Sequence, residues 1–420
     1  MPTFLHMADI HLGYRQYQSD ERLKDFSYAF ERAIDSAIQK QVDFVLIAGD
    51  LFDKATIGPQ TLLHAKRPLD SLRTHNIPAI AINGNHDRVR YGNQFSWLDY
   101  LEEDECLTVL KPTFRQGDIE LIPINPTRPT NGTSGGYIDL HGVRVIGLPY
   151  VGASTASALQ ALTYKVPELP TDEVQFTVLM GHFGIEEEVP TINDGVCYAQ
   201  IMPLKPAVDY LALGHVHKPI ERKNWIYNPG SLESCGMDER RWRGGWFYVD
   251  VETGTGNYQA NHVKGTRRPM HRWPFPVDEY DTPEALYDGV RDDLLRTKPM
   301  LVSRQRPVAE LRLEGLLGFD RHDLDIRHIQ TMLTEIIEPL VGRVSNHTVS
   351  DENEIVVDQR LDRTELERQV LLELFSRDKR YRDEAEQWAK LAQQVKSMVL
   401  AENDPTAIVA RINEGTRDAR

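Results

Sequence analysis

The first hundred residues alternate between short apolar runs and longer amphipathic stretches. The apolar runs are typical of strands buried on both faces, and they occupy residues 3–8, 44–48 and 78–82. Between them, apolar residues recur at helical spacing over 20–39, and a second helix is expected over 58–75, where Pro68 should kink or divide it. The order strand, helix, strand, helix, strand predicts an α/β fold.

Strand-like runs continue beyond residue 140. They follow a stretch at 111–138 that is rich in proline and glycine and is interpreted as an irregular insertion. The further strands are expected at 143–148, 176–180, 210–213, 225–227 and 245–251.

The pattern changes after residue 255. Proline-bearing segments at 268–269 and 273–276 indicate a linker to a smaller α/β unit. In that unit we expect helices at 282–296 and 322–338, and strands at 308–313 and 355–357. From residue 361 the pattern is helical. The predicted domains are therefore 1–255, 277–358 and 361–420.

Polar side chains follow the predicted strands at their carboxyl ends. A lone histidine after a strand usually has a structural role, and a Gly-Asp pair is a common turn. Their recurrence favours one shared site, because strand ends in α/β folds converge on one edge of the sheet. The residues are Asp9, His11, Asp50, Asn85, His86, His182, His215 and His217.

Seven of these eight side chains, all except His86, suit two metal ions. Their mixed nitrogen and oxygen donors favour manganese, iron or zinc over calcium. Asp50, on the central strand, is the best candidate for a ligand that bridges both ions. Two divalent ions about 3.5–4 Å apart position the attacking and leaving oxygens of a phosphoryl group. They also outweigh the charge of the two aspartates, so the site should attract phosphate.

His86 should not be a ligand, because Asn85 beside it takes the coordination position. We expect His86 to donate a hydrogen bond or proton to the leaving oxygen, with Asp87 holding its ring. The alternative is that His86 only supports the turn.

Composition narrows the class of protein. The net charge of −15 argues, taken alone, against a nucleic-acid partner, although a cationic metal site could still capture phosphate. No stretch approaches the roughly 18 apolar residues of a membrane span, and the N-terminus lacks the basic region of a signal peptide. We therefore expect a cytoplasmic protein. Its three cysteines form no Cys-x-x-Cys pair, and disulfides are not expected.

Five motifs resemble those of the calcineurin-like metallophosphoesterases in order and spacing. They are Asp9-x-His11, Gly49-Asp50, Gly84-Asn85-His86-Asp87, Gly181-His182 and Gly214-His215-x-His217. The resemblance covers residues 1 to about 251. It implies a two-sheet α/β sandwich with flanking helices.

Within that superfamily the chain resembles the SbcD-type DNA break-repair nucleases. The segments that carry this resemblance are 4–13, 49–53 and 227–231. It implies a small α/β capping domain that binds DNA, a helical C-terminal tail, and manganese-dependent cleavage of double-stranded ends and single strands. It also implies one ion on Asp9, His11, Asp50 and His217, and the other on Asp50, Asn85, His182 and His215. Many members have histidine where this chain has Asp53, which leaves the role of Asp53 open.

Basic side chains outside the motifs are candidates for DNA contacts. Arg240, Arg241 and Arg243 surround Trp242, and further cations follow or flank the motifs at Arg88, Arg90, Lys218, Lys223, Arg267 and Arg268. A solvated charged face is the alternative interpretation.

The resemblance implies two protein partners as well as nucleoid DNA. The helices of 361–420 would dock on the coiled-coil root of an SbcC-type ATPase, or else simply pack on the capping domain. A homodimer would form through the nuclease domain. The helix 92–101, with Phe95, Trp97, Leu98 and Leu101, is a candidate surface, unless it belongs to the core.

Two other functions share the same motifs. One is a metallophosphoesterase for small molecules such as cyclic nucleotides. The other is a non-catalytic scaffold, although such proteins typically lose ligands and none is missing here.

Overall fold

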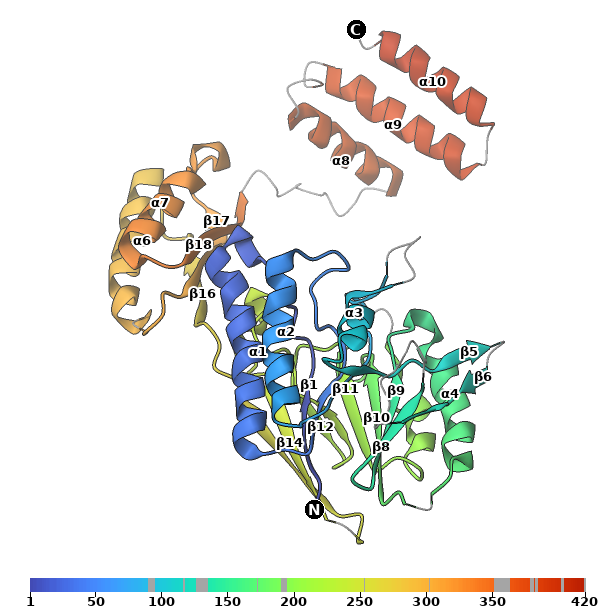
Figure 1. Cartoon of the computed structure of the whole chain (residues 1–420). Helices are drawn as coiled ribbons and strands as arrows, with labels where there is room; N and C mark the ends of the chain where they lie inside the picture. Colours follow the sequence, from blue (N-terminus) through green and yellow to red (C-terminus); the bar gives the residue numbers. More distant parts are fainter. Residues whose placement is uncertain are drawn as a thin grey trace. The chain divides into compact units, whose positions relative to one another are not determined.

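The computed structural model describes most of the chain. The described residues are 1–89, 95–115, 118–125, 135–171, 173–189, 195–252, 254–301, 303–350, 363–377, 381, 384–401 and 404–418. Their contacts separate two compact units (Figure 1). The first unit comprises Met1–Trp273, Leu294–Leu311 and Gln330–Arg343, and the second comprises Pro274–Asp293, Arg312–Ile329 and Val344–Arg420.

Two large sheets build the first unit. The six-stranded sheet has the order β15 (Tyr258–Lys264), β14 (Gly245–Val251), β1 (Thr3–Met7), β2 (Phe44–Ile47), β3 (Ala79–Ala81) and β4 (Thr108–Val109). The seven-stranded sheet has the order β12 (Ile220–Arg222), β13 (Ile226–Asn228), β11 (Tyr210–Gly214), β10 (Phe176–His182), β9 (Val143–Leu148), β8 (Tyr137–Leu140) and β7 (Pro123–Ile124). Strands β1 to β4 pair in parallel, as do β9, β10, β11 and β13. The expected two-sheet α/β architecture is confirmed.

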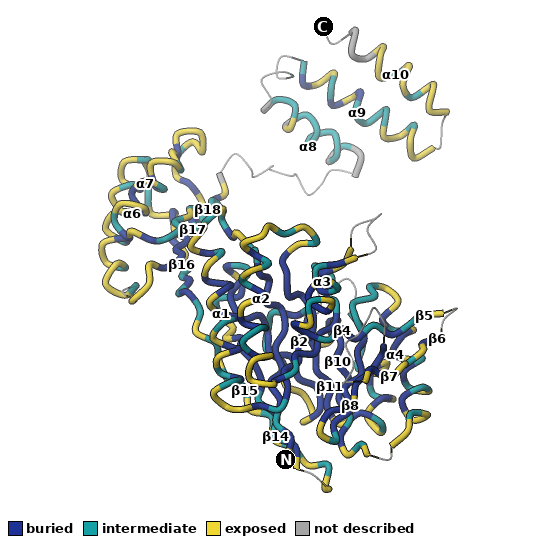
Figure 2. Tube along the Cα trace, viewed as in Figure 1, coloured by how far each residue is buried: buried dark blue, intermediate teal, exposed yellow. Residues whose placement is uncertain are grey.

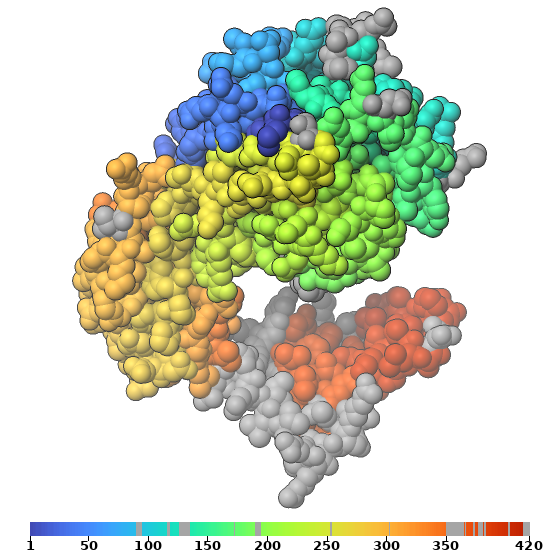
Figure 3. Space-filling model, turned by 90° about the horizontal axis from the view of Figure 1, so that it is seen from below, coloured from blue at the N-terminus to red at the C-terminus, as the bar shows by residue number. Residues whose placement is uncertain are grey.

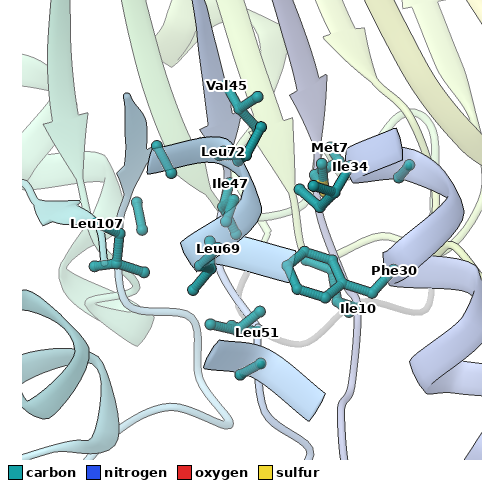
Figure 4. Close-up of a cluster of buried hydrophobic side chains, with 14 of the residues drawn as sticks. Met7, Ile10, Phe30, Ile34, Val45, Ile47, Leu51, Leu69, Leu72 and Leu107 are labelled. Atoms are coloured by element: carbon teal, nitrogen blue, oxygen red, sulfur yellow. The ribbon is translucent and has the colours of Figure 1, made fainter. Parts of the chain in front are cut away.

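Strand β2 explains why its sequence is apolar without alternation. Val45 and Ile47 point into a core with the helices α1 (Asp20–Lys40) and α2 (Pro59–Thr74), as Figure 4 shows. Phe44 and Leu46 point into a second core, between the two sheets. Both faces of the strand are therefore buried, and Figure 2 shows the central strands dark blue.

Helices cover the outer faces of both sheets. On the six-stranded sheet, α1 begins where the Ser19 hydroxyl accepts the backbone N–H of Arg22, and it ends at Gln41, which is left-handed. Pro68 lies inside α2, which continues through it, so the helix is not divided there and the expected kink stays a prediction. On the seven-stranded sheet, α4 (Thr155–Lys165) and α5 (Tyr198–Ile201) close a third core.

One helix and one strand pair between β3 and β8 lie outside the two large sheets. Helix α3 (Trp97–Glu103) buries Leu98 and Leu101 in the first core, while Phe95 before it is 57% exposed. Strands β5 (Thr113–Arg115) and β6 (Asp118–Glu120) form a hairpin within the predicted insertion.

The six-stranded sheet extends past the predicted boundary at residue 255. Strand β15 pairs antiparallel with β14 and forms the edge of that sheet. Figure 3 shows the yellow atoms of this part of the chain against the dark-blue N-terminus, where Val251 N–H bonds the Pro2 carbonyl. The predicted linker segment 273–276 forms part of strand β16 (Met270–Pro276), and the division between the two units falls within it, after Trp273.

Strand β16 belongs to a third sheet, with the order β16, β17 (Val308–Leu317) and β18 (Val341–Ser350). The helices beside these strands in the sequence are α6 (Pro283–Thr297) and α7 (Ile326–Ile337), close to their predicted positions. The strand expected at 355–357 lies outside the described residues.

The C-terminal region is helical, as predicted. It contains α8 (Arg363–Arg377), α9 (Ala385–Leu400) and α10 (Pro405–Asp418). The rings of Phe375, Tyr381 and Trp388 cluster between α8 and α9, and Arg411 of α10 donates to Gln394 of α9. Among the helices that the structure describes, none is long and apolar enough to cross a membrane.

Candidate metal centre

The polar residues that follow the strands meet at the carboxyl ends of both large sheets. Asp9 and His11 follow β1, Asp50 follows β2, and Asn85 follows β3. His182 ends β10, and His215 and His217 follow β11. The parallel register of these strands brings residues that are up to 208 positions apart in the sequence to one place.

The backbone is held in an unfavourable conformation at four of these residues. Asp9, His11 and Asp50 each have φ 52°, and His215 has φ 84°. Left-handed backbone at a residue other than glycine costs on the order of 1–3 kcal/mol and persists only where the surroundings impose it. Here the N–H groups of Asp9 and His11 bond the carbonyls of Gly49 and Asp50, which ties the two loops together.

Glycines beside the ligands allow the close approach. A Cβ atom on Gly49 would lie 2.2 Å from Nδ1 of His182, and one on Gly84 would lie 2.1 Å from Oδ1 of Asp50. Any larger residue would push the imidazole or the carboxylate out of place. Gly49 and Gly84 therefore allow the His182 imidazole and the Asp50 carboxylate to pack directly against the backbone.

One half of the centre is formed by Asp50, Asn85, His182 and His215. Nε2 of His182 lies 3.3 Å from Oδ2 of Asp50 and 3.1 Å from Oδ1 of Asn85. Nδ1 of His215 lies 2.9 Å from the same Asn85 oxygen. Nδ1 of His182 is 2.7 Å from the Ala48 carbonyl, to which it donates, so Nε2 is the nitrogen that faces the site.

The other half contains His11 and His217. Their Nε2 atoms face each other at 3.1 Å, and Nε2 of His11 is 3.9 Å from Oδ2 of Asp50. Donor atoms of Asp9, Asp50 and His182 also lie within 4.8 Å of one another. Asp50 therefore lies between the two halves.

These donors fit two divalent cations. Two imidazole nitrogens that face each other beside carboxylates are satisfied together by a cation between them. His11 is 2% exposed, and within the described part of the chain its Nδ1 has no hydrogen-bond partner. The structure brings the expected ligands together at this edge of the sheets, and their assignment to two ions stays a prediction.

Burial and charge act together on the ionisation of the centre. Burial raises the pKa of Asp9 to about 6, although His217 and His182 lower it. Burial also opposes ionisation of Asp50, but the charge and hydrogen bond of His182 outweigh it and hold that pKa below its usual range. Burial lowers the pKa of His182, but the charge and hydrogen bond of Asp50 outweigh burial and raise that pKa to about 9. His182 therefore holds Asp50 in its ionised form.

His86 has a different partner from the one expected. Its Nδ1 lies 2.7 Å from the carbonyl oxygen of Asp53, and its ring packs edge-on against His11 at 4.8 Å. The expectation that Asp87 holds the His86 ring was wrong. The Asp87 carboxylate instead accepts the backbone N–H groups of Leu51, Phe52 and Gly84 at 3.2, 3.0 and 3.1 Å.

Asp87 thus joins the loop after β2 to the loop after β3. A carboxylate satisfies three converging N–H donors, which a protonated acid or an amide does less well. Asp53 gains a defined place too, because its carboxylate lies 3.8 Å from Nδ1 of His11 while its carbonyl holds His86.

Sequence reasoning missed three residues at the centre. Oε1 of Glu239 lies 2.8 Å from Nδ1 of His217. Cys235 groups with His11 and His217, with one donor atom of each within 4.8 Å of the others. The Tyr150 ring lies 5.5 Å from the His215 ring. None of the three stands in a recognisable motif, so the sequence carried no signal for them.

The basic candidates divide into outward and inward side chains. Arg88 is exposed and stacks over Tyr150 at 5.5 Å, and Lys218 directly follows His217. Arg240 and Arg243 line a cavity of 490 Å³ with Trp242 and Lys264, and Arg241 is exposed nearby. Arg90 lies outside the described residues. The cation at Lys223 is exposed and lies over the Tyr198 ring at 5.2 Å.

Arg267 and Arg268 are less available than the sequence suggested. Arg268 is 7% exposed and pairs with Asp25, with its Nη2 at 2.9 Å from Oδ1. Arg267 donates to the Ser231 and Leu232 carbonyls. Both side chains are therefore engaged in contacts within the protein.

Comparison with known proteins agrees with the geometry. The model of the calcineurin-like phosphoesterase family matches residues 2–219. The DNA double-strand break repair protein Mre11 of Archaeoglobus fulgidus is 32% identical over 242 residues, which cover 56% of this chain but only 51% of that protein. The Mre11 protein of Aeropyrum pernix is 28% identical over 307 residues, 70% of this chain and 68% of the relative.

A longer match is found at lower identity. The Mre11 protein of Sulfolobus acidocaldarius is 23% identical over 360 residues, which cover 83% of this chain and 84% of that protein. These similarities confirm the resemblance to break-repair nucleases that the motifs indicated. The family match spans more than half of the chain, so this protein belongs to the calcineurin-like phosphoesterase family.

Proposed function

We propose that the protein hydrolyses phosphodiester bonds of DNA with two divalent metal ions, as the nuclease subunit of a break-repair complex. The observation that carries this proposal is the position of the ionised Asp50 between the His11–His217 pair and the Asn85–His182–His215 group. The likeness to relatives named as DNA double-strand break repair proteins supports DNA as the substrate class. Such a nuclease would act at the nucleoid.

The chain's own residues have separable roles in this reaction. When bound, the two ions supply positive charge to the phosphate and activate water for in-line attack. Asp9, Asp50 and the histidines hold that charge in place. Nδ1 of His86 donates to the Asp53 carbonyl, so Nε2 is the nitrogen available to the substrate. We assign Nε2 the role of donating a hydrogen bond or proton to the leaving oxygen. Asp87 keeps the two loops in register.

We propose manganese as the working ion and duplex ends and single strands as the DNA forms that are cut. Mixed imidazole, carboxylate and amide donors accept manganese. Arg88 beside Tyr150, Lys218, and the cavity of Arg240, Trp242 and Arg243 offer positive charge for the DNA backbone. Arg241 is exposed next to that cavity.

The C-terminal helices are proposed to bind the coiled-coil root of an SbcC-type ATPase. In this region several large apolar side chains are exposed: Leu374, Val399, Leu400, Val409 and Ile412. Apolar residues at the surface of helices are suited to helix-in-groove contacts. A homodimer is proposed through the surface of Phe95 and Tyr100, which are 57% and 37% exposed, because Leu98 and Leu101 belong to the core.

The test compares substrates under one condition. The manganese-reconstituted protein is given linear duplex DNA, single-stranded DNA and a cyclic nucleotide, alongside Asp50→Asn. We expect both DNA forms to be cleaved, the cyclic nucleotide to be spared, and Asp50→Asn to lose activity on DNA. Preferential hydrolysis of the cyclic nucleotide would instead support a small-molecule phosphoesterase. Absence of bound metal after reconstitution would support a non-catalytic scaffold.

A further inference from the structure

A thiol lies beside the metal centre and has no part in the proposed hydrolysis. Cys235 follows β13 and precedes the short helix Met237–Arg241. Its sulfur, one nitrogen of His11 and one nitrogen of His217 all lie within 4.8 Å of one another. His11 is 2% exposed, and its Nε2 faces Nε2 of His217 at 3.1 Å while its Nδ1 lies 3.8 Å from a carboxylate oxygen of Asp53. The thiol therefore lies beside a buried imidazole pair.

One carboxylate fixes both the thiol and the imidazole. Oε1 of Glu239 lies 2.8 Å from Nδ1 of His217, while Oε2 accepts the backbone N–H of Cys235 at 2.9 Å. The Ser231 hydroxyl also bonds Oε2 at 3.2 Å. Glu239 thus directs Nε2 of His217 toward His11 and holds the Cys235 segment against the same histidine, so the position of the thiol is set by the fold.

The other two cysteines have different surroundings. Cys106 is buried in the first core, with its sulfur 3.3 Å from a carboxylate oxygen of Asp104. Cys197 precedes α5, and its N–H bonds Gln200. Cys235 is the only one of the three cysteines that belongs to a group with metal-ligand spacing among the described residues.

We propose that Cys235 is a further ligand of the ion held by His11 and His217, and that it shifts the preference of this half of the centre from manganese toward zinc. On binding, the thiol releases its proton to solvent and its sulfur joins the two imidazole nitrogens. Thiolate with imidazole is a donor set that favours zinc, whereas oxygen-rich sets favour manganese. This inference rests on the metal centre of the proposed function, but it does not depend on the substrate.

Metal binding by a thiol is coupled to the loss of its proton. A divalent cation deprotonates a coordinating thiol outright. Zinc affinity should consequently rise with pH, because a proton is released on binding.

Cobalt(II) provides a direct readout, because a thiolate ligand gives a charge-transfer band in the near ultraviolet that nitrogen and oxygen ligands do not. The ion is titrated into metal-free wild-type protein, Cys235→Ser and the matched control Cys197→Ser. We expect the band in the wild type and in Cys197→Ser, and its loss in Cys235→Ser. The zinc affinity of Cys235→Ser should fall roughly tenfold or more, because even outer partners of a ligand contribute that much, and its manganese affinity should change less.

The outcomes separate this inference from the proposed function. Cobalt d–d absorption without the charge-transfer band in wild type would overturn the role of Cys235 and leave the metal centre standing. No cobalt absorption of either kind would overturn both. A band that persists in Cys235→Ser would also contradict the inference.

A measurement on the unmodified protein covers the case in which Cys235→Ser does not fold. Iodoacetamide alkylation is followed by peptide mass spectrometry, with and without zinc. We expect zinc to protect Cys235 and to leave Cys197 reactive. Equal alkylation of Cys235 in both conditions would reject the proposal.

Discussion

Nδ1 of His217 donates a hydrogen bond to Oε1 of Glu239 over 2.8 Å, and this leaves Nε2 directed at Nε2 of His11. The Glu239 carboxylate also affects the pKa of His217. Burial lowers the pKa of His217, but Cys235, Glu239 and Asp9 outweigh it and raise that pKa well above the usual range. Glu239 therefore fixes the orientation of this imidazole and contributes to its raised pKa.

Replacing Glu239 should weaken metal binding without removing a ligand. We expect Glu239→Ala to lower manganese affinity by about 10- to 100-fold, as loss of the hydrogen-bond partner of a metal-ligating histidine does. Glu239→Gln should lose less, because its amide oxygen still accepts from His217. Titration calorimetry of the metal-free proteins measures this, with the exposed Glu221→Gln as the control. Equal affinities in all four proteins would show that His217 does not need its partner.

His86 is expected to affect turnover and not metal content. Its ring is held by the Asp53 carbonyl and lies beside His11 without being among the expected ligands. We expect His86→Ala to lower kcat on DNA by about 10²–10⁴, the usual contribution of a general acid. Elemental analysis should find the wild-type metal content, and His75→Ala, at an exposed position, serves as the control. Turnover near the wild-type value at full metal content would leave His86 with only a supporting role.

Much of this site could be predicted because the relevant residues follow strands. The bounds of β9 and β14 agree with the predicted strands at 143–148 and 245–251. Once the strands are known to be parallel, their ends must meet, and Asp50 and His182 are brought together by topology alone. Local pattern and fold point to the same answer in this part of the chain.

The features that were missed depend on long-range contacts or on edge strands. Glu239 and Cys235 reach His217 through the connection between β13 and β14, which has no periodicity to read. Strand β16 contains Pro274 and Pro276, which suggested a linker, but it is an edge strand and edge strands tolerate proline. The role of Asp87 required the positions of N–H groups some 36 residues away.

The arginine cluster provides a test of DNA binding that does not depend on catalysis. Arg240 and Arg243 line the cavity with Trp242, and in the described structure neither forms an ion pair with a carboxylate. We expect Arg240→Ala, Arg241→Ala and Arg243→Ala together to flatten the plot of log affinity against log salt. The slope should change by about 0.9 for each duplex phosphate that the arginines no longer neutralise. Fluorescence anisotropy over a salt series measures the slope.

A control for this experiment keeps the change in net charge equal. It combines Lys24→Ala, Lys40→Ala and Arg73→Ala, which remove exposed cations from α1 and α2. Its slope should match that of the wild type. If both triple variants lower the slope equally, the effect comes from overall charge and not from phosphate binding by the arginine cluster.

His6 should make the fold sensitive to acid. Nδ1 accepts from the Tyr210 hydroxyl and Nε2 donates to the Leu213 carbonyl, each at 3.0 Å, and burial lowers the pKa of His6 to about 3. The unfolded chain has the ordinary pKa of 6.5, so below that pH it binds a proton that the folded chain does not. Stability from this residue is complete above pH 6.5 and falls as the pH drops toward 3.

The comparison that checks this is wild type against His6→Gln, which keeps one donor and one acceptor. Between about pH 7 and about pH 5 the wild type should lose about 2 kcal/mol more free energy of unfolding than the variant, the value that follows from the two pKa values. Urea unfolding at both pH values gives the difference. Parallel losses in the two proteins would mean that His6 is protonated in the folded state.

The left-handed backbone at Asp9, His11, Asp50 and His215 limits how this protein can be improved. Glycine would adopt that conformation without strain, so the same replacement that relaxes the chain also deletes an expected ligand. Selection for thermostability alone should therefore recover glycine at these positions. Selection that also requires activity should not recover it. At these four residues, stability and chemistry are opposed by the geometry of the chain itself.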